Sequence, residues 1–330
     1  MTTRRDFLLG LGAAGVATAV PAALGATDGH RLLTATDVHV KDYPTVAAIE
    51  WIGRELERAT DGRLRLRMYH SGQLGRESEA IDMARFGAID ITRVYSGALN
   101  NAFPLTQVLS LPYVFDSVAH LRRALDGPVG AQVLRGFGAR DLVGLAIYDC
   151  GARCFYNARK PIVGPADLHG LKFRVPSSDI FMRMIRMLGG NPTPLAYGEV
   201  FSALQTHLID GAENNLRSFH SSRQFEAARY WSQSEHSYAP DVLLMSRRSF
   251  DSLRADDRSL LLDIARRSVA VMRALWDESE AQARTALVAA GVRMNECDLP
   301  AFRKAVQPLL TDYHRVPALE ALYRDIRSLA

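Results

Sequence analysis

The stretch Leu171-Lys172-Phe173-Arg174-Val175-Pro176 predicts a short β-strand that ends at Pro176, with an arginine next to its last residue. A helix is expected directly after it, with Ser177 as the N-cap and Gly189-Gly190 as the stop. The apolar residues of this helix recur at helical spacing and are Phe181, Met184, Ile185 and Leu188. A strand that leads straight into an amphipathic helix indicates an α/β fold.

Strand and helix patterns alternate along the rest of the chain. The segment 63–70 alternates strictly between apolar residues and arginines, which predicts a half-buried strand, and the almost continuously apolar segment 142–148 is typical of a strand covered on both faces. Further strands are expected at 31–38, 88–94, 209–212 and 241–246, and further helices at 44–60, 77–85, 118–125, 129–137, 199–207, 258–290 and 301–313. This rhythm predicts an α/β protein with a largely parallel sheet.

The length of 330 residues suggests two domains, at about 150 residues for each. A second unit is expected to begin near Gly151, and the strand at 241–246 is expected to return to the first domain. Two α/β units that are joined by more than one crossing leave a cleft between them. Ligand sites favour such interfaces and the carboxyl ends of parallel strands.

The composition is that of a soluble globular protein, with 48% hydrophobic and 23% charged residues. The net charge of +4 comes from 40 basic and 36 acidic residues without a basic run, which argues against nucleic acid as a partner. The cysteines are Cys150, Cys154 and Cys297, too few for a disulfide scaffold. Three free thiols are expected, although a tight Cys150–Cys154 pair is the alternative.

The N-terminus has the features of an export signal. Thr3-Arg4-Arg5-Asp6-Phe7-Leu8 resembles a twin-arginine signal, and the apolar stretch 8–20 is shorter than the roughly 20 residues needed to cross a bilayer. We expect a signal peptide at 1–26, with a retained membrane anchor as the alternative. The G-x-G-x-x-G pattern at 10–15 follows a charged start and no strand, so these glycines are assigned to the signal.

The sequence lacks the P-loop, the H-E-x-x-H, the G-x-S-x-G and the paired C-x-x-C motifs, and its nine histidines lack metal-ligand spacing. No metal or cofactor is expected. Arginines and amides do follow predicted strands, and a guanidinium can hold a carboxylate through two parallel hydrogen bonds. These residues are Arg93, Arg153, Arg174, Asn214 and Asn215, and His39 also follows a strand directly. Their convergence indicates a binding site for an organic acid.

Several motifs, in order from about residue 31 to 325, resemble those of a known family. They are Ser71-Gly72-Gln73-Leu74-Gly75, Leu111-Pro112-Tyr113-Val114-Phe115, the segment 167–176, Asn191-Pro192-Thr193-Pro194, and Asp210-Gly211-Ala212-Glu213-Asn214. The chain resembles the DctP-type solute-binding proteins of TRAP (tripartite ATP-independent periplasmic) transporters. The resemblance implies a two-lobed, type II-like periplasmic binding protein, not an enzyme, with a ligand cleft between the lobes and a long helix spanning both. The expected lobe I is 27–150 with 240–275, and lobe II is 151–239 with 276–330.

The resemblance also assigns site residues. Arg174 matches the carboxylate-binding arginine of the family, and Arg153 matches a second arginine if one residue is inserted. Tyr197 matches an aromatic residue that lines the ligand, Asn214 an amide, and Glu77 an acidic position after the Gln-Leu-Gly turn. The complete set of expected ligand-binding residues adds Asn215, Arg93, His39 and Tyr148.

Other segments are similar to the subgroup that binds hexuronates such as glucuronate or galacturonate. They are Asp37-Val38-His39, the segment 42–46, Thr92-Arg93-Val94, the segment 149–153, and Glu213-Asn214-Asn215. Cys150 and Cys154 depart from the serines expected there. In such a site Arg174 binds the carboxylate, while Glu77, His39 and the amides suit the sugar hydroxyls, which both donate and accept.

The resemblance implies a periplasmic protein whose partners are a hexuronate and the small and large membrane subunits of a TRAP permease. Two alternatives to a hexuronate-binding protein remain open. One is a C4-dicarboxylate, an aldonate or a 2-oxo acid on the same scaffold. The other is a secreted enzyme that acts on acidic sugars.

Overall fold

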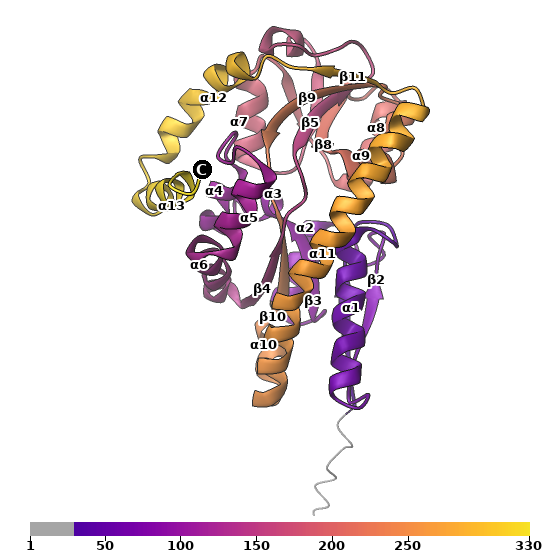
Figure 1. Ribbon diagram of the computed structural model, residues 1–330, viewed down its shortest axis with the longest axis vertical. Helices are drawn as coiled ribbons and strands as arrows, with labels where there is room; N and C mark the ends of the chain where they lie inside the picture. The colour runs from indigo at the N-terminus through magenta and orange to yellow at the C-terminus, as the bar shows by residue number, and fades with distance from the viewer. Residues whose placement is uncertain (1–29) are drawn as a thin grey trace, which may run out of the picture.

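The computed structural model describes residues 30–330, so the expected signal peptide at 1–26 lies outside the described residues. Two mixed β-sheets with helices packed around them form the two expected lobes (Figure 1). Lobe I is built around the first sheet and lobe II around the second. The exact division of the chain at 150 and 275 stays a prediction.

The sheet of lobe I has the strand order β2-β1-β3-β10-β4. Its strands are β1 (Arg31–Thr36), β2 (Leu64–Tyr69), β3 (Ile91–Tyr95), β4 (Leu142–Tyr148) and β10 (Asp241–Ser246). β1 runs parallel to β2 and β3, whereas β10 runs antiparallel to β3 and β4. β10 is the returning strand predicted from the sequence. It runs antiparallel to β3 and β4 because the chain enters β10 from lobe II, at the end of the sheet where β3 and β4 finish.

The sheet of lobe II has the order β11-β9-β5-β8-β6-β7. Its strands are β5 (Arg153–Asn157), β6 (Lys172–Val175), β7 (Asn191–Pro194), β8 (Gly211–Asn215), β9 (Tyr230–Ser237) and β11 (Arg293–Glu296). β5 runs antiparallel to β8 and β9, and the other pairs are parallel. The sequence did not predict β5, β7, β9 or β11. β7 contains two prolines and β9 and β11 are largely polar, so hydrogen bonding to neighbours, and not an apolar pattern, makes them strands.

Helices cover both sheets. They are α1 (Pro44–Ala59), α2 (Glu77–Phe86), α3 (Ser96–Leu99), α4 (Gln107–Ser110), α5 (Val118–Asp126), α6 (Pro128–Gly136), α7 (Asp179–Met187), α8 (Val200–Gln205), α9 (Leu216–Ser221), α10 (Arg247–Asp251), α11 (Ala255–Ala289), α12 (Leu299–Tyr313) and α13 (Pro317–Arg327). One expected detail is wrong: the N-cap of α7 is Ser178 and not Ser177, and the Ser178 side chain does not cap the helix. The Ser178 hydroxyl instead lies 3.0 Å from the side-chain amide of Asn100 in lobe I.

The long helix predicted at 258–290 is α11, whose 35 residues extend about 50 Å. Figure 1 shows it running from beside α1 to beside α9, and it contacts both of these helices. Leu261, Ile264 and Met272 belong to the core between α1 and the sheet of lobe I. Leu287, near the other end, belongs to the core of lobe II with Phe219 and Trp231. One helix therefore contributes to both cores.

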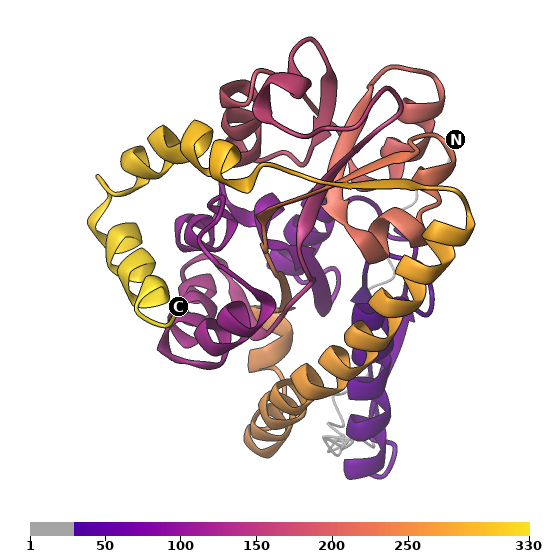
Figure 2. The ribbon, with the colours of Figure 1, turned by 45° about the horizontal axis from the view of Figure 1, so that its top comes forward.

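Two strand crossings run side by side between the lobes. Tyr148 at the end of β4 pairs with Asp241, and Arg153 at the start of β5 pairs with Ser237, so the links 149–152 and 238–240 are neighbours. At the C-terminus, α12 contacts α7 and β9 of lobe II, whereas α13 reaches back to α4 and α6 of lobe I (Figure 2). α13 was expected in lobe II, but it packs on lobe I.

Gly144 of β4 lets α6 approach the sheet closely. A Cβ at this position would lie 2.8 Å from the carbonyl oxygen of Leu134 in α6. We therefore expect Gly144→Ala to lower the free energy of unfolding by about 1–3 kcal/mol, because helix and strand would have to separate. Urea unfolding measures this change. Gly164→Ala is the matched control, since nothing lies within 4 Å of its Cβ position, and an equal loss in the two variants would contradict the packing argument.

Candidate functional site

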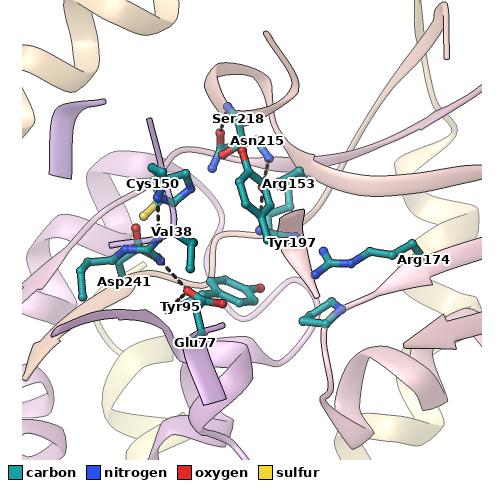
Figure 3. Close-up of a pocket in the computed structure, with 14 residues that line it drawn as sticks. Val38, Glu77, Tyr95, Cys150, Arg153, Arg174, Tyr197, Asn215, Ser218 and Asp241 are labelled. Atoms are coloured by element: carbon teal, nitrogen blue, oxygen red, sulfur yellow. Dashed lines mark hydrogen bonds and ion pairs between the residues drawn. The ribbon is translucent and has the colours of Figure 1, made fainter. Parts of the chain in front are cut away.

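A pocket between the lobes brings together eight of the nine predicted site residues. They are His39, Glu77, Arg93, Arg153, Arg174, Tyr197, Asn214 and Asn215 (Figure 3). Four of them come from strands: Arg93 from the middle of β3, Arg174 from the next-to-last position of β6, and the two asparagines from the end of β8. Arg153 begins β5 opposite Asn215, because the antiparallel register pairs these two residues.

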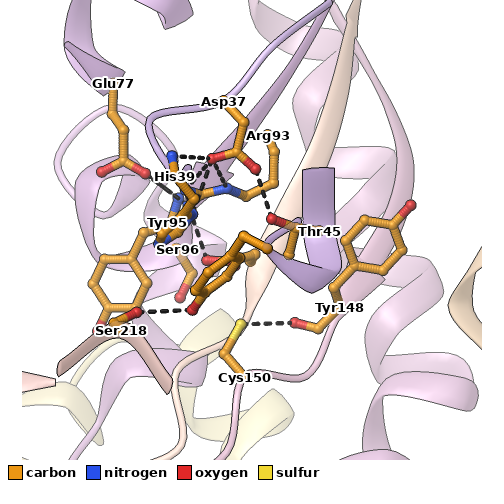
Figure 4. Close-up of polar contacts among 12 residues, drawn as sticks. Asp37, His39, Thr45, Glu77, Arg93, Tyr95, Ser96, Tyr148, Cys150 and Ser218 are labelled. Atoms are coloured by element: carbon orange, nitrogen blue, oxygen red, sulfur yellow. Dashed lines mark hydrogen bonds and ion pairs between the residues drawn. The ribbon is translucent and has the colours of Figure 1, made fainter. Parts of the chain in front are cut away.

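The wall that lobe I contributes is organised around the buried Arg93 (Figure 4). Its Nη2 donates to Asp37 Oδ1 at 2.6 Å, and its Nη1 donates to Glu77 Oε1 at 2.8 Å and to Asp241 Oδ1 at 3.1 Å. Burial alone would raise the pKa of Asp37, but Arg93 and His39 outweigh it and hold that pKa well below its usual range. Asp37 is therefore ionised at any physiological pH.

Lobe I presents more negative than positive charge to the cleft. One guanidinium, that of Arg93, faces three carboxylates. Glu77 and Asp241 line the pocket and bind Arg93 through Oε1 and Oδ1, which leaves Oε2 and Oδ2 as hydrogen-bond acceptors. This wall therefore suits groups that donate hydrogen bonds.

In lobe II, Arg153 is neutralised by Glu213. Arg153 Nε donates to Glu213 Oε2 at 2.5 Å and Nη2 donates to Oε1 at 2.8 Å, so the pair is bidentate. Nη1 donates to Asn214 Oδ1 at 2.9 Å, and His236 Nε2 lies 3.3 Å from Glu213 Oε2. Burial would raise the pKa of Glu213, but Arg153 and His236 outweigh it and lower the pKa to about 2. Arg153 is thus largely occupied by the protein itself.

Arg174 has no such counterion among the described residues. It is buried, and its hydrogen bond runs from Nε to the carbonyl oxygen of Leu195 at 2.9 Å. The ion pairs within residues 30–330 include Arg93 and Arg153 but not Arg174. Burial lowers the pKa of Arg174, whereas nearby carboxylates raise the pKa values of Arg93 and Arg153. Figure 3 shows its guanidinium directed into the pocket, where the four N–H groups of its terminal nitrogens can hold an anion.

The two amides beside Arg153 are oriented by their oxygens. Asn214 Oδ1 accepts from Arg153 and from the backbone N–H of Asn215 at 2.9 Å. Asn215 Oδ1 accepts from the backbone N–H of Ser218 at 2.7 Å and so caps α9. Both NH₂ groups remain as donors at the pocket, which suits the oxygens of a ligand.

Two aromatic rings, those of His39 and Tyr197, line the pocket, and Tyr43 packs behind them. The ring of His39 stacks on Tyr43 with 3.8 Å between centroids, and it meets the edge of Tyr197 at 5.1 Å. The Tyr43 hydroxyl lies 2.8 Å from the hydroxyl of Ser218 in α9, so this contact joins the two lobes. Arg76 of lobe I also reaches Glu199 of lobe II in an exposed ion pair. The structure therefore has the two walls of the cleft in contact.

Residues 36–315 match the family model of DctP, the bacterial extracellular solute-binding proteins of family 7. The chain belongs to this family. A curated solute-binding protein from Chromohalobacter salexigens is 36% identical over 88% of this chain and 87% of its own length. The family is one of extracellular solute-binding proteins.

Solved TRAP periplasmic solute-binding proteins have the same fold. One from Xanthobacter autotrophicus, with bound β-D-galacturonate, is 42% identical, has a TM-score of 0.88 and covers 90% of this chain and 99% of its own. One from Bradyrhizobium, in complex with D-galacturonate, is 43% identical with a TM-score of 0.89 and covers 90% and 100%. One from Roseobacter denitrificans, with bound β-D-glucuronate, is 38% identical with a TM-score of 0.87 and covers 90% and 99%.

In this DctP-family protein, Tyr148 does not line the pocket, contrary to expectation. β4 is the edge strand of its sheet, and although Cys150 just beyond its end lines the pocket, the Tyr148 side chain packs towards α11. The Tyr148 side chain is fully buried, and its hydroxyl lies 2.7 Å from Ser268 of α11. Tyr148 is therefore a core residue in this structure.

Six lining residues were not among the expected site residues: Val38, Tyr95, Cys150, Pro176, Ser218 and Asp241. Asp241 is the first residue of the returning strand and pairs with Tyr95 in β3. Asp241 and Tyr95 are neighbours because of the strand order of the sheet, which the sequence pattern does not reveal. Ser218 follows Asn215 by one helical turn, and an N-cap prediction at Asn215 would have placed it near the site.

All three cysteines are free thiols, so the alternative Cys150–Cys154 pair does not form in this structure. Residues 30–330 contain no group of three or more histidine, cysteine or acidic side chains that could hold a metal ion. No helix in that range is both long and apolar enough to cross a membrane.

We expect Glu213→Gln to lower the free energy of unfolding by about 3 kcal/mol at pH 7, because it leaves the buried Arg153 without its counterion. The pKa of Glu213 is 4.5 in its ordinary state and about 2 when folded. Its contribution is therefore complete above about pH 4.5 and is lost as the pH falls towards 2. The difference between wild type and variant should shrink over this interval, as measured by urea unfolding.

Glu57→Gln is the control for this experiment, since Glu57 pairs with Arg65 on the surface, where both side chains are about half exposed. Its effect should stay below about 1 kcal/mol. A difference between wild type and Glu213→Gln that does not change from pH 7 to pH 2.5 would contradict the assigned ion pair.

Proposed function

We propose that this protein captures a hexuronate, of the D-glucuronate or D-galacturonate type, and delivers it to the membrane subunits of a TRAP permease. The observation that supports this most is the state of Arg174. It is a buried arginine at the cleft whose terminal nitrogens bind no carboxylate of residues 30–330, while the two neighbouring arginines are neutralised. A ligand carboxylate supplies the missing charge in a planar, bidentate geometry. The relatives with bound galacturonate and glucuronate agree with this choice.

The opposite wall favours a sugar acid over a dicarboxylate. Glu77 and Asp241 of lobe I offer carboxylate oxygens to the pocket. Sugar hydroxyls donate to these oxygens, whereas a second ligand carboxylate would be repelled by them. A hexuronate, with one carboxylate for Arg174 and several hydroxyls for lobe I, satisfies both walls.

Capture follows from closure of the two lobes on the ligand. Arg174, Asn214 and Asn215 belong to lobe II, and His39, Glu77 and Arg93 belong to lobe I. A ligand that bridges them favours the closed form, because only that form makes both sets of contacts. The adjacent crossings at 149–152 and 238–240 serve as the hinge. Export to the periplasm would use the twin-arginine signal expected at 1–26.

The alternative of a secreted enzyme has less support. A glycosidase needs two carboxyl groups on opposite sides of the bond that it cleaves. Glu77 and Asp241 both accept hydrogen bonds from Nη1 of Arg93, so they lie on the same wall of the pocket. Incubation with uronate oligomers, followed by analysis of the products, tests for hydrolysis directly.

Arg174→Ala should weaken hexuronate binding by about 30-fold or more, because a charged hydrogen-bonded partner is lost in a closed site. Arg174→Lys keeps the charge but loses the planar fork, so it should still bind about tenfold more weakly than wild type. Titration calorimetry with D-galacturonate and D-glucuronate measures both changes. The control is Arg186→Ala, which removes an exposed arginine of α7 in the same lobe. Wild-type affinity in Arg174→Ala would refute the assignment.

A panel of organic acids separates the proposed ligand from its alternatives. D-Galacturonate or D-glucuronate should raise the melting temperature in a concentration-dependent way, because a ligand that binds only the folded state stabilises it. Succinate and other C4-dicarboxylates should give no shift, since their second carboxylate would face Glu77 and Asp241. A larger shift with a dicarboxylate, an aldonate or a 2-oxo acid than with either uronate would favour that class instead.

A further inference from the structure

Tyr95 is the last residue of β3 and lines the pocket without having been expected there. Its side chain is more than nine-tenths buried, yet its hydroxyl has no hydrogen-bond partner within residues 30–330. Buried hydroxyls are usually paired, since leaving one unpaired costs about 1–3 kcal/mol. In Figure 3 the Tyr95 side chain stands among the labelled residues of the cleft, between Glu77 and Arg174.

The ring of Tyr95 is held in one position from several sides. The guanidinium of Arg153 lies 4.5 Å above its centroid, and the ring of Phe181 lies 6.0 Å away. Gly97 lets the ring lie against the start of α3, because a Cβ there would come within 2.3 Å of Tyr95 Cε1. The backbone is fixed as well: the N–H of Tyr95 donates to Glu77 Oε1 at 2.9 Å. The hydroxyl is therefore presented at a fixed point.

The guanidinium above the ring is engaged by other residues. Arg153, whose guanidinium lies over the ring, donates its hydrogen bonds to Glu213 and Asn214. Burial raises the pKa of Tyr95, so the hydroxyl stays protonated and can both donate and accept. A ligand hydroxyl is the complementary group, because it too can donate and accept.

We propose that Tyr95 is a specificity-determining residue, whose hydroxyl forms a hydrogen bond with one ring hydroxyl of the bound sugar acid. This inference rests on the proposed function. It assigns to Arg174 the recognition of the acid group and to Tyr95 the recognition of the sugar. A site with a buried group built to bond a hydroxyl rejects the analogue that lacks it, because the group then stays unpaired.

The test compares wild type with Tyr95→Phe by titration calorimetry. The ligands are D-galacturonate, D-glucuronate and a set of deoxy-hexuronates that each lack one ring hydroxyl. Tyr95→Phe should weaken binding of the parent acid about two- to tenfold, the value of one neutral hydrogen bond. For one deoxy analogue the two proteins should bind equally, because that analogue lacks the partner of Tyr95. An unchanged affinity for the parent acid, or the same loss with every analogue, would overturn the proposal.

The stability of the ligand-free protein gives a second, independent readout. The hydroxyl of Tyr95 has no partner in the part of the chain that the structure describes, so Tyr95→Phe should leave the melting temperature unchanged or raise it. Tyr113→Phe is the matched control: Tyr113 is also buried, but its hydroxyl donates to the carbonyl oxygen of Ser234 at 3.0 Å. That variant should melt lower and keep the wild-type preference among the ligands. A fall in melting temperature for Tyr95→Phe would show a structural role and contradict the inference.

These outcomes are separable from failure of the proposed function. If wild type binds no hexuronate, the proposed ligand is wrong, and the comparison is repeated with the acid from the panel that does bind. If wild type binds a hexuronate and Tyr95→Phe binds it and every analogue equally well, only the role of Tyr95 is refuted. Gly97→Ala adds a further check, because its methyl group would displace the ring and should weaken the same ligands.

Discussion

The charge of Arg174 is the constraint on which the cleft depends. A buried guanidinium without a counterion is costly, since an ion loses its hydration when it leaves water. Arg93 and Arg153 occupy comparable positions, and the protein compensates both with carboxylates. Arg174 keeps its terminal nitrogens for another partner. The uncompensated charge of Arg174 disfavours closure of the cleft without an anion and favours closure around an anion. Affinity and closure therefore have the same physical origin.

The remaining polar groups give the site its selectivity. Lobe I offers carboxylate oxygens held in place by Arg93, and lobe II offers amide NH₂ groups whose oxygens are tied to Arg153 and α9. Each group is therefore oriented before a ligand arrives, which lowers the entropic cost of binding. Acceptors on one wall and donors with a positive charge on the other match a molecule with hydroxyls at one end and a carboxylate at the other.

The scaffold couples this site to movement of the lobes. The two crossings beside Tyr148 and Arg153 are short and adjacent, and α11 packs on both cores. The polar contacts Tyr43–Ser218 and Arg76–Glu199 join the walls on the cleft side, so they form only when the walls meet. Water can form hydrogen bonds with the same groups when the walls separate, so breaking these two contacts costs little free energy.

The sequence alone determined the parts of this protein that depend on local pattern. The apolar periodicity of 44–60 and 258–290 predicted α1 and α11, and the alternation of 63–70 predicted β2, because these elements bury one face of a regular repeat. Arg174 was placed at a strand end by the residues around it. Polar strands such as β9 and β11 were not predicted, because hydrogen bonds to neighbouring strands, and not an apolar periodicity, make them strands.

Only the tertiary structure decided which strand ends share the cleft. The sheet order brings Asp241 and Tyr95 into the pocket and leaves Tyr148 at an edge against α11, although all three end or begin strands. It also decided which arginine keeps a free guanidinium, because the pairing of Arg153 with Glu213 joins residues 60 positions apart. Charge compensation depends on distance in space, and a linear pattern of residue types does not contain that distance.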